Sequence, residues 1–174
     1  MFSIEVCSLP DGALLGVYQR NGTYTDCYKT DIPGVVTYAE YVRAFYTTPL
    51  FKLERSALKW MLAKPSSDAD VNLLAEGKVD VFSAWDVEKR GKNQILMCDY
   101  QKRTRSWLMV ELVEGKDGTL TRLYFGSAVV PVKNIKTGRL SLGAGFYALL
   151  WFHKIYSVAL LHFARSRLTK RLST

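Results

Sequence analysis

Cysteine is scarce in this sequence, and its pattern excludes two structural classes. The 174 residues contain only Cys7, Cys27 and Cys98, an odd number of widely spaced thiols without a Cys-x-x-Cys motif. Small secreted domains and zinc knuckles use paired or closely spaced cysteines. We therefore expect neither a disulfide framework nor a structural zinc site. The same pattern indicates a protein of a reducing compartment. The first residues lack the basic segment and long apolar run of a secretory signal, so the expected location is cytoplasmic.

Acidic residues are absent from the C-terminal third. No Asp or Glu follows Asp117, whereas nine of the 24 Lys and Arg residues do, so the formal net charge of +8 arises there. Four of these lie near the end of the chain, at Arg165, Arg167, Lys170 and Arg171. Basic residues in that place complement the dipole of a helix C-terminus. They also suit an anionic surface, so a membrane-surface or partner-docking role is one functional hypothesis.

Histidine is equally scarce, and the common catalytic motifs are missing. His153 and His162 are the only two, and nine positions apart on a helix they point in roughly opposite directions, so they cannot chelate one metal ion. No nucleophile elbow, phosphate-binding loop or zinc-protease motif is present. Gly143, Gly145 and Ala148 match the spacing of the dinucleotide fingerprint, but that motif requires an acidic residue about twenty positions later, and none exists. We expect no metal and no cofactor.

Basic and aromatic residues are mixed in residues 100–107, a composition that grooves for single-stranded nucleic acid share. Trp107, however, falls within an apolar strand, and the basic residues precede it at a turn. The segment is better explained as a charged hairpin tip. We therefore predict no nucleic-acid partner.

The composition predicts a single folded domain over residues 1–174. Hydrophobic residues make up 48% of the chain and no internal repeat is present, which is enough apolar surface for one core at this length. Asn21-Gly22, between apolar segments at 14–18 and 24–28, is the strongest short hairpin signal. We therefore expect one or two leading strands.

Three helices are predicted by their start signals. Thr37 and Glu40 form a capping box, and Pro49 stands at a first helical position. Ser67 precedes a shorter helix that Gly77 ends. The apolar stripe expected on the second helix comprises Leu50, Leu53, Ala57, Leu58, Met61 and Leu62.

Beyond Gly77 the hydrophobic period changes from helical to alternating. Strands are predicted at residues 81–88, 95–100, 105–113 and 119–130. Their connections are too short for parallel crossovers, so they form an antiparallel meander. One long helix follows at residues 146–172, and Lys154 in its middle is costly in a bilayer. We therefore expect a helix packed on the sheet, and an α+β fold with short helices after the first strands.

The long helix needs an apolar stripe if it is to cover the sheet. We predict that this stripe comprises Phe146, Leu149, Phe152, Tyr156, Leu160 and Phe163.

Three segments resemble a bacterial family of unknown function, namely LFKLER at 50–55, RTRSWLM at 103–109 and LYFGSAVVP at 123–131. The Trp-x-Val-Glu motif from Trp85 to Glu88 and the late aromatic helix are similar to the C-terminal extension of certain NAD-dependent epimerase-like proteins. The resemblance covers most of the chain from about Thr37 onward. It implies the START-like helix-grip fold of the SRPBCC superfamily, in which a curved antiparallel sheet wraps a long C-terminal helix around an apolar cavity. Members include lipid carriers, hormone binders and cyclases, so the fold alone selects no function.

Large aromatic residues are concentrated in the elements that would line such a cavity. We predict that it is lined by Trp85, Trp107, Tyr124, Phe146, Trp151, Phe152 and Tyr156. The leading hypothesis is a binding module for an apolar small molecule that can carry an anionic group.

The second hypothesis is an enzyme of the cyclase or hydratase kind. His153 or Tyr156 would act as acid or base. Asp99 or Arg105 would orient the reacting group, although these two residues are also expected to form an ordinary ion pair across a hairpin turn.

Overall fold

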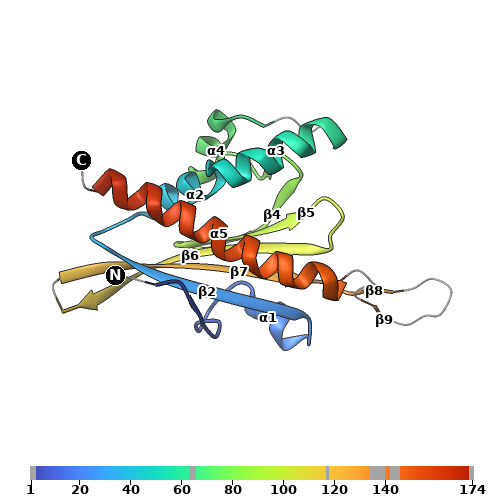
Figure 1. Cartoon of the computed structure of the whole chain (residues 1–174), viewed down its shortest axis with the longest axis horizontal. Helices are drawn as coiled ribbons and strands as arrows, with labels where there is room; N and C mark the ends of the chain where they lie inside the picture. The colour runs from blue at the N-terminus through green and yellow to red at the C-terminus, as the bar shows by residue number, and fades with distance from the viewer. Residues whose placement is uncertain (1–2, 63–65, 117, 134–139, 142–145, 173–174) are drawn as a thin grey trace.

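The computed structural model describes residues 3–62, 66–116, 118–133, 140–141 and 146–172, with side chains for all of these except 57–62, 132–133, 140–141 and 146–153. The helices are α1 (Gly16–Arg20), α2 (Tyr38–Tyr46), α3 (Pro49–Leu62), α4 (Asp68–Ala75) and α5 (Phe146–Leu172). The strands are β1 (Glu5–Val6), β2 (Tyr24–Pro33), β3 (Val81–Phe82), β4 (Trp85–Arg90), β5 (Gln94–Asp99), β6 (Thr104–Gly115), β7 (Gly118–Val129), β8 (Val132–Lys133) and β9 (Leu140–Ser141). Figure 1 shows α5 running across one face of the sheet.

Seven strands form one antiparallel sheet in the order β1-β2-β7-β6-β5-β4-β3. The predicted meander is confirmed, because β4, β5, β6 and β7 are antiparallel neighbours in chain order. The predicted strand at 81–88 is divided at Ser83, whose φ of 56° turns the chain so that Phe82 faces Trp85. The alternation of apolar and polar residues continues through this tight turn, which is why the sequence indicates a single strand.

Of the one or two leading strands predicted around Asn21-Gly22, the one at residues 24–28 is present within β2, but the hairpin itself is not formed. Residues Gly16–Arg20 form α1, and Asn21 is its C-cap. Gly22 does adopt a positive φ of 71°, but that conformation serves the end of a helix as well as a hairpin turn. β2 pairs instead with β1 and along its whole length with β7, contacts that no local pattern indicates.

The predicted helix starts are confirmed. The Thr37 backbone N–H donates to the Glu40 carboxylate at 2.8 Å, and the Glu40 N–H donates to the Thr37 hydroxyl at 3.3 Å, which completes the capping box of α2. Ser67 caps α4 in the same way, Pro49 begins α3, and Gly77 follows α4 with a φ of 72°. Each signal spans only four residues, so it is independent of the tertiary fold.

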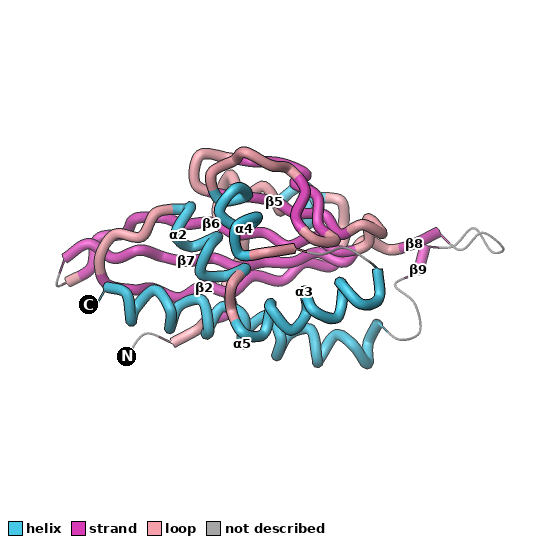
Figure 2. Tube along the Cα trace, turned by 90° about the horizontal axis from the view of Figure 1, so that it is seen from above, coloured by secondary structure: helices cyan, strands magenta, loops and turns pink. Residues whose placement is uncertain are grey.

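Two hydrophobic clusters lie on opposite faces of the sheet. The helix face is covered by α2, α3, α4 and α5, and its buried sheet residues include Leu108, Leu123 and Phe125. On the opposite face Trp107 and Tyr124 are packed under the N-terminal segment that contains α1. Figure 2 shows α3 and α5 on the same side of the sheet. The central strands of the sheet are therefore buried on both sides, as their apolar residues on both faces require.

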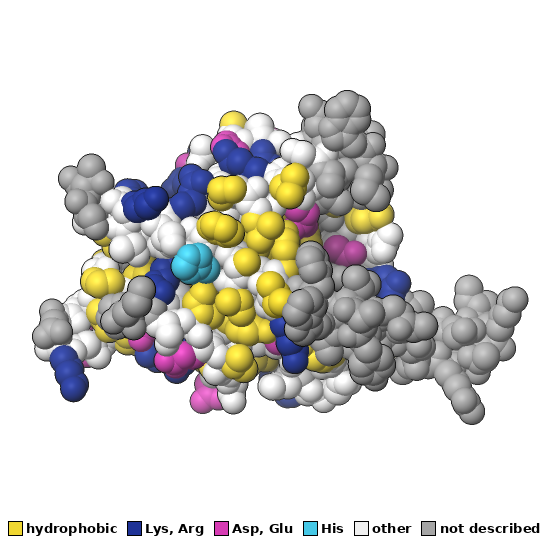
Figure 3. All heavy atoms as spheres, in the orientation of Figure 1, with side chains coloured by type: hydrophobic (Ala, Val, Ile, Leu, Met, Phe, Trp, Pro, Cys, Tyr) yellow, Lys and Arg dark blue, Asp and Glu magenta, His cyan; other side chains and the backbone are white. Residues whose placement is uncertain are grey.

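Helix α5 has the predicted bounds, and of its predicted stripe Leu160 is buried and Tyr156 packs against the core. The side chains of Phe146, Leu149 and Phe152 lie outside the described residues. Among the α5 side chains from Lys154 onward, the buried ones are Ser157, Leu160, Leu161, Ala164 and Leu168. Phe163, predicted to be buried, is 40% exposed because its direction on the helix is away from this face. Hydrophobic side chains gather over this side of the molecule (Figure 3), and Ile155 and Val158 are among the exposed ones. Within the described residues, no helix is long and apolar enough to cross a membrane.

Candidate functional site

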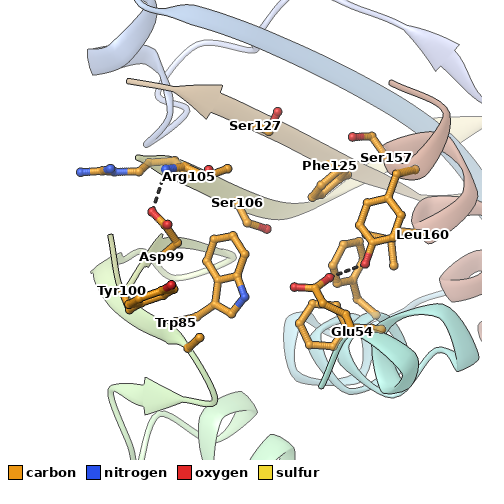
Figure 4. A pocket seen from close by; sticks show the side chains of 15 residues that line it. Glu54, Trp85, Asp99, Tyr100, Arg105, Ser106, Phe125, Ser127, Ser157 and Leu160 are labelled. Carbon is orange, nitrogen blue, oxygen red and sulfur yellow. Dashed lines mark hydrogen bonds between the residues drawn. The ribbon is translucent and has the colours of Figure 1, made fainter. Parts of the chain in front are cut away.

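A cavity of 240 Å³ lies between the helix face of the sheet and helices α2, α3 and α5. Its lining is mainly aromatic and aliphatic, with a few polar groups (Figure 4). The lining residues are Phe45, Phe51, Glu54, Ala84, Trp85, Asp99, Tyr100, Thr104, Arg105, Ser106, Phe125, Ser127, Tyr156, Ser157 and Leu160. This combination of apolar walls and a few convergent polar groups is typical of small-molecule sites.

The most unusual polar group in the cavity is the carboxyl of Glu54. Helix α3 places it beside α5, where the Tyr156 hydroxyl donates a hydrogen bond to it. Burial among apolar side chains raises the pKa of Glu54 above its ordinary value, although the Tyr156 hydroxyl and the Trp85 indole oppose the rise by hydrogen bonding. Burial and the neighbouring carboxyl also raise the pKa of Tyr156. The pair therefore favours the protonated forms of both groups.

Three serines add hydroxyl groups to the cavity wall. Ser127 Oγ donates to Asp26 at 2.7 Å, which holds it in place. Ser157 is fully buried, and its Oγ has no hydrogen-bond partner. A buried hydroxyl without a partner costs about 1 to 3 kcal/mol. Ser157 is therefore a group that a polar atom of a ligand would satisfy.

The end of the cavity opposite Glu54 contains Asp99 and Arg105 (Figure 4). Asp99 Oδ1 accepts hydrogen bonds from the backbone N–H groups of Arg103 and Thr104, both at 2.7 Å, and thereby fixes the β5–β6 turn. Arg105 Nε donates to Glu88 at 2.8 Å. The ion pair predicted between Asp99 and Arg105 is thus replaced by one between Arg105 and Glu88, because the Arg105 side chain reaches toward β4.

Tyr18 of α1 completes this arrangement. Its hydroxyl donates to Glu88 at 2.5 Å and accepts from Arg105 Nε at 2.8 Å. Its ring centroid lies 4.9 Å from the Arg105 guanidinium carbon. Burial and the hydrogen bond to Glu88 raise the pKa of Tyr18 to about 12. The charge of Arg105 is therefore already balanced within the protein.

The predicted site residues separate into three groups. Trp85, Tyr156, Asp99 and Arg105 line the cavity. Trp107 and Tyr124 lie on the opposite face of the sheet, where the Trp107 indole donates to Gln94 at 2.8 Å and the Tyr124 hydroxyl donates to Glu111 at 2.9 Å. The side chains of Phe146, Trp151, Phe152 and His153 lie outside the described residues.

Glu54, Phe51 and Ser157 are cavity residues that the sequence prediction missed. The predicted stripe of α3 included Leu53, which is 68% exposed, whereas Phe51 is buried. An acidic residue and a serine within apolar helices were visible in the sequence, but such residues usually face solvent. Only the position of α3 beside α5 turns them inward.

No protein-family model matches this chain, and no curated protein or solved structure matches it significantly. Its function is therefore inferred from the cavity itself.

Proposed function

We propose that this protein binds an apolar small molecule in the cavity beneath α5, through a neutral polar group that faces Glu54 and Ser157. The observation that carries the proposal is the unpartnered, fully buried Ser157 hydroxyl in the wall of a cavity of 240 Å³ that also has aromatic and aliphatic walls. A ligand that fills this space would bury apolar surface and satisfy that hydroxyl.

The charges around the cavity favour a neutral ligand over an anionic one. The Glu54 carboxyl would repel an anionic group once ionised, and its protonated form offers a hydrogen bond to a neutral one. Arg105, the cation at the other end, is already paired with Glu88. We therefore narrow the ligand expected from the sequence to one with a hydroxyl, carbonyl or amide group.

The helix-grip architecture is part of this proposal. A seven-stranded antiparallel sheet, helices inserted between its second and third strands, and a long C-terminal helix across one face support a START-like assignment. The bacterial family resemblance from the sequence agrees with it. Both assignments lead to the same expectation of a ligand between sheet and helix.

Two naphthalene compounds test the ligand class directly. Calorimetric titration should detect binding of neutral 2-naphthol, and binding of anionic 2-naphthoate at pH 7 should be at least about tenfold weaker, which is about 1.4 kcal/mol. The two share their apolar ring system and differ in the polar group. Equal affinity for both would contradict the preference for a neutral group.

A cavity-filling variant tests the location. Ser157→Leu places a larger side chain in the cavity wall and should abolish 2-naphthol binding. Ser56→Leu on the exposed side of α3 is the matched control and should bind as the wild type does. Unchanged binding by folded Ser157→Leu protein would exclude this cavity as the site.

A second candidate function is acid–base catalysis on a ligand in the same cavity. The Glu54 carboxyl with its raised pKa, hydrogen bonded to Tyr156, is the specific observation that favours it. Glu54→Gln keeps the size of the side chain but cannot transfer a proton. Compounds extracted from the purified wild type should then be converted by wild type and bound unchanged by the variant, as followed by mass spectrometry. Binding without conversion by either protein would exclude catalysis and leave ligand binding as the only proposed function.

A further inference from the structure

Two of the three cysteines face each other across the edge of the sheet. The β1–β2 pairing sets Val6 opposite Tyr28, so the next pair along the register is Cys7 and Cys27. The Cys7 N–H donates to the Cys27 carbonyl at 3.0 Å, which continues the ladder. Their sulfur atoms are 3.2 Å apart, which is within hydrogen-bond distance for sulfur.

This spacing is compatible with a covalent bond between them. Directly opposed residues of an antiparallel pair have Cα atoms about 4.5 to 5.5 Å apart. Disulfides join Cα atoms about 4.4 to 6.8 Å apart. A disulfide between Cys7 and Cys27 would therefore form without a change in strand register.

The two thiols differ in their surroundings. Cys7 is partly exposed, whereas Cys27 is buried in the cluster beneath α1. The hydrogen bond within the pair is the main factor that lowers the pKa of Cys7, and the nearby Lys29 and Arg122 lower it further. The same pairing and burial raise the pKa of Cys27. Cys7 is therefore the more nucleophilic thiol of the pair.

A second hollow gives small molecules access to the pair. It has a volume of 290 Å³, and both Cys7 and Cys27 line it, together with Ser8, Tyr24 and Lys154. It is separate from the cavity beneath α5, because the two share no lining residue. Cys98, the remaining thiol, is buried and has no cysteine beside it.

We propose that Cys7 and Cys27 form a reversible dithiol–disulfide couple that a small peroxide oxidises. The Cys7 thiolate attacks one oxygen of hydrogen peroxide, the O–O bond breaks, and the departing hydroxide takes a proton to become water. The Cys27 sulfur then attacks the sulfenic acid sulfur of Cys7, the S–O bond breaks, and a second water leaves with the Cys27 proton. Two thiols are oxidised and one peroxide is reduced to two waters.

The disulfide would attach the first strand to the body of the sheet. β1 is two residues long and forms the outermost strand, so few backbone hydrogen bonds hold it. A covalent link at Cys7 would fix the N-terminal segment that covers Trp107 and Tyr124. Oxidation state would thus control how firmly that face of the sheet is covered.

Mass spectrometry of the full chain tests the couple. Treatment of the wild type with hydrogen peroxide should remove the mass of two hydrogen atoms and reduce the number of titratable thiols from three to one. Peptide mapping should find a fragment joining Cys7 to Cys27, and dithiothreitol should restore all three thiols. Oxidation confined to Cys98, or intermolecular disulfides as the first product, would overturn the proposal.

Single variants separate the two steps. Cys27→Ser should stop at the sulfenic acid of Cys7, which dimedone traps as a single adduct. Cys98→Ser is the matched control, and it should form the same internal disulfide at the wild-type rate. Absence of a Cys7 adduct in folded Cys27→Ser protein, with an unreacted dithiol in Cys98→Ser, would show that the pair is inert to peroxide.

Discussion

The packing of α5 on the sheet can be tested by one truncation of a side chain. Leu161 lies in the helix-face cluster and has an exposed fraction of 0%. Leu161→Ala removes three carbon atoms from this cluster and leaves a space that the rigid sheet cannot fill. Such substitutions cost about 2 to 5 kcal/mol. Because domains of this kind have unfolding free energies of about 5 to 15 kcal/mol, the variant should lose a large part of its stability.

The measurement is urea denaturation followed by tryptophan fluorescence, with thermal unfolding followed by circular dichroism. For a chain of this size each kcal/mol lowers Tm by about 2 to 4 °C. Leu172→Ala is the matched control on the same helix, because Leu172 is 44% exposed and surface substitutions change stability by less than about 0.5 kcal/mol. Equal effects of the two substitutions would refute the packing of α5 described above.

Three further predictions follow from the same structure. A chain ending at residue 142 lacks α5, including Leu160, Leu161 and Leu168, which are buried in its described part and contribute roughly 4.5 to 9 kcal/mol at about 1.5 to 3 each. This chain should therefore aggregate or unfold, and a soluble fragment with a cooperative unfolding transition would disprove this. Burial raises the pKa of Glu54 in the folded protein above its ordinary value of 4.5. Between the ordinary pKa and the raised one, the folded state therefore binds more protons than the unfolded chain. The free energy of unfolding should fall as the pH rises through this range. Denaturation at a series of pH values should show that Glu54→Gln lacks this fall, and parallel curves for the two proteins would count against a buried carboxyl. Gly126→Ala should cost about 1 to 3 kcal/mol in urea denaturation, because its Cβ would lie 2.9 Å from the Asp26 carbonyl oxygen and 3.0 Å from the Trp107 ring; wild-type stability would mean that β2 and β7 are less closely packed there.

The sequence alone determined the local structure of this protein. Thr37 with Glu40, Pro49 and Ser67 predicted the starts of α2, α3 and α4, because a helix cap is formed by residues within one turn. The meander and the bounds of α5 were also predictable, since short connections force antiparallel pairing and a helical period marks a helix. The hairpin predicted from Asn21-Gly22 was wrong, because a positive φ such as that of Gly22 occurs at helix ends as well as in hairpin turns.

Tertiary structure alone decided which residues meet. Trp107 and Leu108 are adjacent and equally apolar, so the alternating pattern of β6 could not tell which of them faces the helices. β2 pairs with β7 across about a hundred residues, and that pairing completes the sheet on which α5 lies. Glu54 and Tyr156 are likewise far apart in the chain, and only the packing of α3 beside α5 brings them into one cavity. Such contacts depend on the free energy of the whole fold, so no local segment of the sequence specifies them.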